Sequence, residues 1–181
     1  MREERVAKRY ARALFQAAVR AQAVDAVNEA LQQLLATLHE QPPLRYLLLN
    51  PLVPRERKQQ MVQESIGRRT HPLLASLLSV LVDKRRERLL PEVARGFSEL
   101  RDEHLGIMRV QAVTAYPLDS QQEQALIRSL ERRTGKTVLL ETQVDPSLIG
   151  GILVRIGDTI IDGSVRGQLQ RLKQYLLNAW G

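Results

Sequence analysis

Residues 100–114 read LRDEHLGIMRVQAVT, and within this stretch the spacing of the apolar residues changes from helical to extended. Leu100 and Leu105 belong to a helical pattern that stops at Gly106. Beyond it, the side chains follow the period-two pattern of a half-buried strand, with Met108, Val110 and Ala112 alternating with Arg109, Gln111 and Val113. The stretch therefore predicts a boundary near residue 106 between a domain at 1–105 and a domain at 107–181. Because it lacks a Ser/Gly run, we expect a short hinge there.

The first 105 residues predict an all-α domain, because apolar residues recur at steps of three and four and the breaks fall at prolines and glycines. Pro54 and Pro72 suit the first turns of two of the helices, and Gly67 suits the end of one. The pattern predicts five helices and one short one, over residues 6–21, 24–38, 44–49, 54–67, 72–82 and 93–105.

The residues after the boundary predict a small α/β domain of about four strands and two helices. Asp119 with Gln122 forms a capping-box pattern, which opens a helix that ends at Gly135. The dipeptide Gly157-Asp158 separates two short strand patterns and favours a tight hairpin. The expected order is a strand at 107–113, a helix at 119–135, strands at 138–144, 152–156 and 159–161, and a last helix from 165 towards 180. The fold class is thus α+β multidomain.

The composition excludes several kinds of site. The chain has 181 residues without a cysteine, so disulfides, thiolate nucleophiles and Cys-based zinc sites are excluded. The three histidines, His39, His71 and His104, form no ligand cluster in the sequence. We therefore expect no metal and no cofactor. The N-terminus has no signal-peptide pattern and no stretch is apolar enough to span a bilayer, so the chain is expected to be soluble or peripheral, without direct membrane insertion.

The basic net charge leaves an alternative function open. Lys and Arg outnumber Asp and Glu by 27 to 20, and the formal net charge is +7. Basic pairs stand at predicted helix ends, at Arg68-Arg69, Arg85-Arg86 and Arg132-Arg133. A basic helical RNA-binding module would use such pairs. Acidic residues stand close to them and cations favour helix C-termini, so a solvated surface is the preferred reading and nucleic acid is not the expected partner.

Two patterns suggest catalysis, and both have a simpler explanation. Gly135-Lys136-Thr137 matches the end of a phosphate-binding loop, but it follows a helix and precedes a strand, which is the reverse of the required order. Asp158 and Asp162 could be a general acid and base or hold a metal, but a hairpin followed by a helix start explains the same residues. Asp162 or Ser164 is expected to bind backbone amides as a cap. No catalytic residue is predicted.

The first helix has an unusually wide apolar face. More than half of its circumference between residues 6 and 21 is apolar or small, and the fifth helix has a similarly broad face. Alanines let another helix axis approach closely, so the spare surface suggests a groove for an amphipathic partner helix. Burial of the first helix by its own neighbours is an equally good explanation of the pattern alone.

Three segments together resemble the delta subunit of bacterial F-type ATP synthases, the counterpart of mitochondrial oligomycin-sensitivity-conferring protein. They are RYARALF at 9–15, RLLP at 88–91, and the run from Gly150-Gly151-Ile152 through GDTIIDGSVRGQL at 157–169. The first is short, whereas the last is long and highly specific. The resemblance covers essentially the whole chain.

The resemblance implies a non-catalytic stator component that clamps the catalytic head of a proton-translocating ATP synthase to its peripheral stalk. It implies an N-terminal bundle of six helices that binds the N-terminal helix of an alpha subunit between its first and fifth helices. By position, Tyr10, Ala13, Leu14, Leu77 and Val80 would line that groove. The C-terminal domain would contact the b subunits of the stalk through its final helix and neighbouring strands. One copy per complex would lie peripherally at the cytoplasmic face of the cell membrane.

Overall fold

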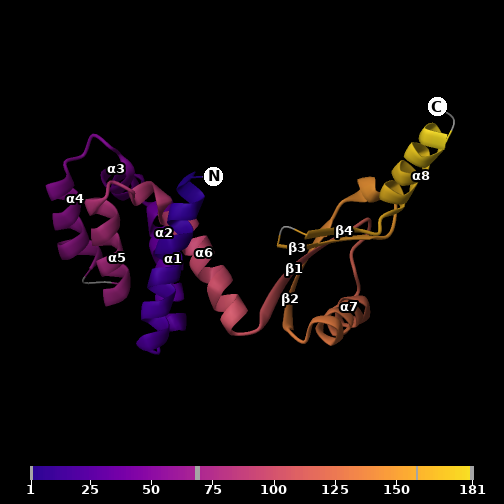
Figure 1. Ribbon diagram of the computed structural model, residues 1–181, viewed down its shortest axis with the longest axis horizontal. Helices are drawn as coiled ribbons and strands as arrows, with labels where there is room; N and C mark the ends of the chain where they lie inside the picture. The colour runs from indigo at the N-terminus through magenta and orange to yellow at the C-terminus, as the bar shows by residue number, and fades with distance from the viewer. Residues whose placement is uncertain (1, 68–69, 158, 180–181) are drawn as a thin grey trace. The chain divides into compact units, whose positions relative to one another are not determined.

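The computed structural model describes residues 2–67, 70–157 and 159–179. The chain divides into two compact units, Met1–Asp102 and Glu103–Gly181, so the boundary falls three residues before the end expected for the first domain. The described residues form eight α-helices and a four-stranded mixed sheet, an α+β architecture (Figure 1). Each unit is described by itself below.

The N-terminal unit contains α1 to α5 and α6 as far as Asp102; the last two residues of α6 belong to the C-terminal unit. The bounds are α1 Arg2–Arg20, α2 Val24–Glu40, α3 Pro42–Leu49, α4 Arg55–Met61, α5 Pro72–Asp83 and α6 Leu90–His104. Two elements differ from the sequence expectation. The helix expected over 54–67 continues beyond α4 as a π-helical turn, η1, Val62–Ile66. Between α5 and α6, where no helix was expected, the chain forms a 3-10 turn, η2, Glu87–Leu89.

One apolar core joins the helices of this unit. It includes Leu31 from α2, Leu48 from α3, Leu78 from α5 and Phe97 from α6, all buried. The ring of Phe97 meets that of Phe15 from α1 edge to face, with 5.7 Å between the ring centroids. Gly96 admits α1 closely, because a Cβ added there would lie 3.1 Å from the Cβ of Ala11. Close packing of α1 against its own unit is therefore built on small residues.

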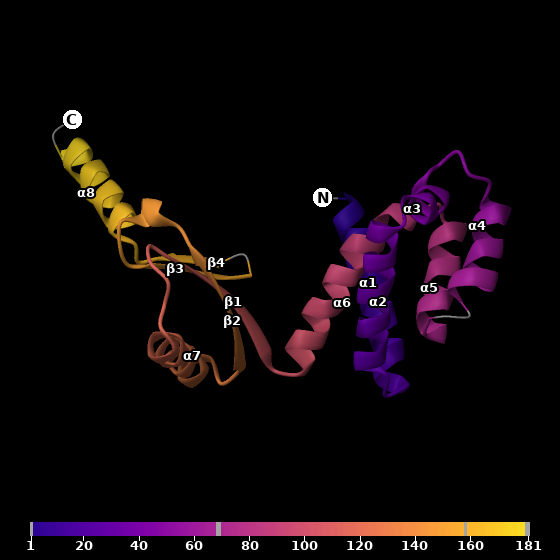
Figure 2. The same ribbon diagram turned by 180° about the vertical axis from the view of Figure 1, so that it is seen from behind.

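The C-terminal unit is a four-stranded sheet with the order β2-β1-β3-β4. The strands are β1 Ile107–Thr114, β2 Thr137–Val144, β3 Ile152–Ile156 and β4 Thr159–Asp162, and the helices are α7 Ser120–Thr134 and α8 Val165–Ala179. A 3-10 turn, η3, spans Pro146–Leu148. β1 and β2 are parallel and joined through α7. β3 pairs antiparallel with β1 on one side and with β4 on the other (Figure 2).

The C-terminal unit has its own core, formed by apolar side chains that alternate with polar ones along the strands. Val110, Val138 and Val154 come from β1, β2 and β3, lie on one face of the sheet and are buried. Ile127 and Leu130 of α7 pack against them.

The capping box of Asp119 and Gln122 is present, and α7 ends at Gly135 in the left-handed conformation (φ 68°). Both predictions are confirmed, and so is the β3–β4 hairpin, although Asp158 lies outside the described residues.

Candidate partner-binding surfaces

The five residues expected to line a groove lie on two helices that pack against each other, α1 and α5. Leu14 and Leu77 are buried and belong to the core of the N-terminal unit. Tyr10 is half-buried against that core, whereas Ala13 is exposed and Val80 is 44% exposed. The structure thus gives these residues different environments, with two in the core and three reaching its surface.

Most of the wide apolar face of α1 is covered by its own unit. Ala7, Ala11 and Ala18 are buried to 1% exposure or less, and Leu14 to 5%. The sequence-based expectation that one core could not cover this face is therefore wrong for its central stripe. This stripe is buried because α2, η2 and α5 all pack against α1. Small side chains on α6 and α1 let α6 approach as well.

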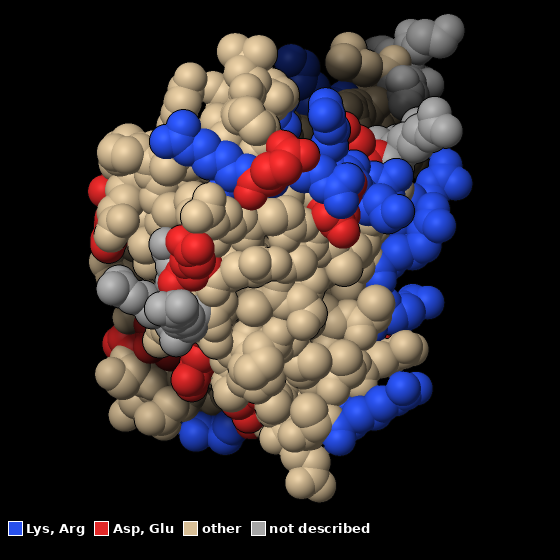
Figure 3. All heavy atoms as spheres, turned by 90° about the vertical axis from the view of Figure 1, so that its left-hand side faces the viewer, with Lys and Arg blue, Asp and Glu red and all other residues tan. Residues whose placement is uncertain are grey.

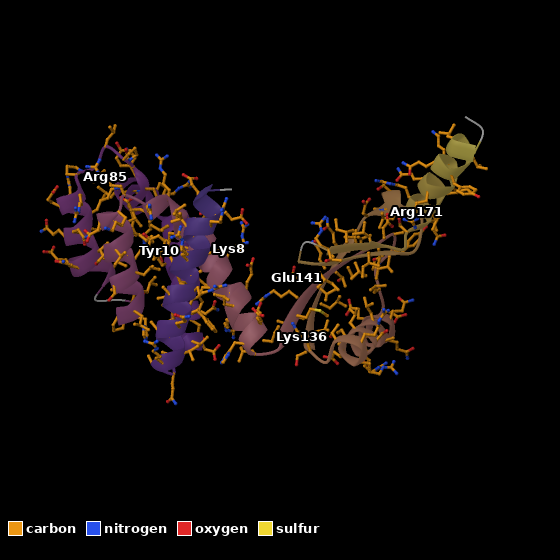
Figure 4. All side chains as sticks on the ribbon, viewed as in Figure 1. Lys8, Tyr10, Arg85, Lys136, Glu141 and Arg171 are labelled. Atoms are coloured by element: carbon orange, nitrogen blue, oxygen red, sulfur yellow. The ribbon has the colours of Figure 1, made fainter. Side chains whose placement is uncertain are left out.

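Tyr10 has a fixed polar end at the edge of this region. Its hydroxyl oxygen accepts a hydrogen bond from Nη1 of Arg86, at 3.2 Å, where the chain leaves α5 for η2. Tyr10 on α1 is therefore tied to the chain just beyond α5, and its side chain is half-buried against the core (Figure 4). Leu73 on α5 and Val6 on α1 are also half-buried against the core, and the five expected residues did not include them.

Charged side chains surround an uncharged surface on this unit. Seen from the side of α4 and α5, neutral side chains cover most of the middle of the visible face, and Lys and Arg gather along one edge (Figure 3). On α1, Lys8 pairs with Glu4 at 3.2 Å. The hydrogen bond from Lys8 holds the pKa of the Glu4 carboxyl below its ordinary value. Such an exposed ion pair contributes little to stability.

The second surface is an uncovered apolar stripe on α8. Val165, Leu169, Leu172 and Leu176 recur at helical spacing, and their exposed fractions are 37%, 54%, 54% and 50%. Tyr175 and Leu177 are more exposed still. The edge strand β4 also exposes Ile160 and Ile161, each 55% exposed, on its two opposite faces. An exposed apolar stripe like that of α8 is typical of a protein interaction site.

The segment Asp162–Gly167 holds the N-terminus of α8. The hydroxyl of Ser164 accepts the N–H of Gly167 at 3.0 Å, and Asp162 Oδ1 accepts the N–H of Ser164 at 2.8 Å and its hydroxyl at 2.6 Å. The hydrogen bonds from Ser164 hold the pKa of the Asp162 carboxyl below its ordinary value, with a smaller contribution from Arg171. The prediction that Asp162 and Ser164 bind backbone amides is confirmed.

Two glycines allow the close packing of the segment Asp162–Gly167 at the start of α8, which is called the joint below. A Cβ on Gly167 would lie 2.3 Å from a carboxylate oxygen of Asp162. A Cβ on Gly151, whose φ is +76°, would lie 2.4 Å from the carbonyl oxygen of Gly163. The most specific part of the sequence pattern is therefore a structural joint, and no acid–base pair forms from it in the described residues.

The remaining sequence leads also have structural roles. Lys136 follows Gly135 in the turn from α7 to β2, as expected for a plain helix-to-strand connection (Figure 4). His71 caps α5, its Nδ1 accepting the N–H of Leu73 at 3.2 Å. Among the described residues, no group of three or more His, Cys, Asp or Glu side chains is placed to hold a metal ion. Arg68 and Arg69 lie outside the described residues.

The helices give no membrane-spanning candidate: in the part of the chain that the structure describes, none is both long enough and apolar enough to cross a bilayer.

Comparison with known proteins gives a consistent result. The chain matches the family model for the ATP synthase delta (OSCP) subunit over residues 6–176. It is 40% identical over 174 residues to ATP synthase subunit delta of Anaeromyxobacter dehalogenans, covering 94% of this chain and 96% of that one. It is 37% identical over 179 residues to ATP synthase subunit delta of Symbiobacterium thermophilum, with 99% and 96% covered.

A solved structure agrees with these relatives. One chain in the cryo-EM structure of the Toxoplasma gondii mitochondrial ATP synthase hexamer aligns with a TM-score of 0.68 and 26% identity, covering 94% of this chain and 97% of that one. The match extends through both units. On this evidence the chain belongs to the ATP synthase delta (OSCP) subunit family.

Proposed function

We propose that this protein joins the catalytic head of an F-type ATP synthase to the peripheral stalk, with each of its two units holding one partner. It is a non-catalytic stator component of that enzyme. This proposal rests on one observation: exposed apolar residues lie on α1 and α5 in one unit and on α8 and β4 in the other. Family membership supports this role and not the RNA-binding alternative.

The N-terminal unit, as a six-helix bundle, binds the amphipathic N-terminal helix of an alpha subunit along α1 and α5. Support comes from the exposure of Ala13 and Val80 beside the half-buried ring of Tyr10. Ala13 is small enough for a foreign helix to approach closely. Leu14 and Leu77 lie beneath, where their burial gives the groove a rigid apolar floor.

The C-terminal unit binds the membrane-distal ends of the b subunits through α8 and the neighbouring edge strand. The exposed stripe on α8 has the spacing with which an amphipathic helix packs against another helix. Burying it against the stalk would remove a large apolar surface from water, which is the main driving force for such association.

The function is mechanical. A rotor turning inside the head would drag the head with it unless a connection fastened to the membrane resisted the torque. A nanomolar joint needs about −12 kcal/mol, which a preformed interface of about 1,600 Å² can supply. One copy per complex would hold the head in this way, peripherally at the cytoplasmic face of the cell membrane.

Ala13→Glu tests the groove. A carboxylate placed against an apolar partner helix is expected to weaken binding of an alpha-subunit N-terminal peptide at least about tenfold, as measured by calorimetry on the full chain. Because Ala13 is exposed, the fold should be retained. Gln16→Glu is the matched control, since it adds the same charge on the polar side of α1 that carries Arg9 and Arg12. Equal affinities of the two variants would reject the groove assignment.

A further inference from the structure

A cavity of about 220 Å³ lies on the N-terminal unit, between the loop before α4 and the turn after α5. Its charged lining is Arg55, Lys58, Arg85, Glu87 and Arg88, and Leu49 and Val82 are among its apolar walls. Pockets for drug-sized ligands run from about 300 to 1,000 Å³, so this cavity suits a more compact ligand. Four cations against one carboxylate make that ligand an anion.

Pairing among these residues leaves two guanidinium groups in excess. Lys58 and Glu87 form an ion pair in which both residues are more than nine-tenths buried. Arg55 is held by Asp83, with its Nη2 2.6 Å from Oδ1. Arg88 donates only a long hydrogen bond, 3.4 Å from its Nε to the carbonyl of Leu49. In the described part of the chain, no side-chain partner is recorded for Arg85, just beyond the end of α5 (Figure 4).

The side chains of Arg85 and Arg88 are exposed, and hydrogen bonds fix the backbone on both sides of the cavity. Arg85 has φ +53°, in the left-handed region where a side chain carries strain and glycine is preferred. Hydrogen bonds from its own N–H to Val82, at 3.1 Å, and from the next N–H to Leu81, at 2.8 Å, fix the turn. On the other wall, Asn50 Oδ1 accepts the N–H of Leu52 at 2.9 Å.

We propose that this cavity binds an oxyanion of the phosphate class, held by the guanidinium groups of Arg85 and Arg88. A guanidinium fork matches two oxygens of a phosphate group, and hydrogen bonds between ionised partners are stronger than those between neutral groups. Lys58 has three ammonium hydrogens and Glu87 accepts one of them, which leaves others for the ligand. The site is separate from the groove residues of α1 and goes beyond the clamp function.

Arg85→Gly is the most informative variant. Glycine suits the left-handed conformation, so the melting temperature should stay the same or rise, while phosphate affinity should fall about tenfold. A purely structural role for Arg85 predicts no loss of binding. Arg88→Ala should weaken binding by a similar factor. Arg95→Ala on α6 removes an exposed positive charge of the same unit outside the cavity and is expected to change affinity less than twofold.

The measurement is calorimetric titration of the full chain with inorganic phosphate and, separately, with ADP, at constant ionic strength. Equal affinity for both assigns the cavity to free phosphate, and ADP binding more than about tenfold tighter assigns it to the diphosphate of a nucleotide. Either result supports the proposal when it depends on Arg85 and Arg88. Absence of saturable binding by both probes, or an equal loss in Arg95→Ala, would overturn it.

Discussion

Single residues decide how α8 is attached to the sheet. Gly151 has a positive φ and no room for a Cβ, because the carbonyl oxygen of Gly163 would lie 2.4 Å away. Gly151→Ala is therefore expected to lower the free energy of unfolding of the C-terminal unit by about 2–4 kcal/mol, measured by urea denaturation. Gly135→Ala is the matched control, with a similar φ of +68° but nothing within 4 Å, and should cost about 1 kcal/mol. If the two variants lost the same free energy of unfolding, the close approach of the Gly163 carbonyl would not be the cause of the destabilisation in Gly151→Ala.

The carboxylate of Asp162 adds a pH dependence to the same joint. Its pKa is lowered in the folded state, chiefly by the hydrogen bonds from Ser164. Its contribution to stability is thus fully present above its unfolded pKa and is lost as the pH falls through the lower folded value. The stability difference between wild type and Asp162→Asn should be greatest near neutral pH and shrink below about pH 4. A difference that is the same at pH 3 and pH 7 would contradict this assignment.

Local interactions explain what the sequence could predict at this scale. The capping box at Asp119, the left-handed Gly135 and the cap at Ser164 depend on residues within a few positions of each other, so their pattern is visible in one dimension. The burial of the Lys58–Glu87 pair was missed. The ion pair joins residues 29 positions apart, and nothing in their spacing indicates the contact.

At the scale of elements, the sequence predicted where the helices and strands lie more accurately than which of their faces the neighbouring elements cover. The helical stripes and β1 follow from the spacing of their apolar residues, and the other three strands from their residue types and the Gly157-Asp158 turn signal. The width of the apolar face of α1 suggested a spare surface, but Ala7, Ala11 and Ala18 are buried in the unit itself. Periodicity reports how much of a helix is apolar and not how many neighbours cover it. The π-helical turn Val62–Ile66 likewise has no signal in the apolar spacing.

The exposed stripe of α8 gives a prediction at the same scale. Leu169 and Leu172 are each 54% exposed, so replacing both by asparagine should change the free energy of unfolding by less than about 1 kcal/mol. The same change should weaken binding of a peptide from the membrane-distal end of a b subunit at least about tenfold, because it removes the apolar area that the interface would bury. Surface plasmon resonance with the full chain measures this affinity.

The control for α8 is Gln168→Asn with Gln170→Asn, which alters exposed polar residues of the same helix. Unchanged b-peptide affinity in the leucine variant, or an equal loss in this control, would place the stalk contact elsewhere.

For the whole molecule, the two proposed binding surfaces belong to separate compact units. The groove variant should therefore lose the alpha peptide and keep the b peptide, and the α8 variant should do the opposite. A short hinge near residue 106 remains a prediction; Gly106, with φ +64°, lies at the start of the C-terminal unit. If the clamp account is correct, either variant breaks the connection between head and stalk without touching the catalytic sites.

The most direct test is to assemble the ATP synthase in membrane vesicles with the full-length chain carrying Ala13→Glu together with Leu169→Asn and Leu172→Asn. ATP hydrolysis and ATP-driven proton pumping are then measured on the same vesicles. We predict that hydrolysis continues while the protons pumped per ATP fall severalfold, because the head turns with the rotor. Wild-type pumping per ATP, in a variant that binds neither peptide, would contradict the account.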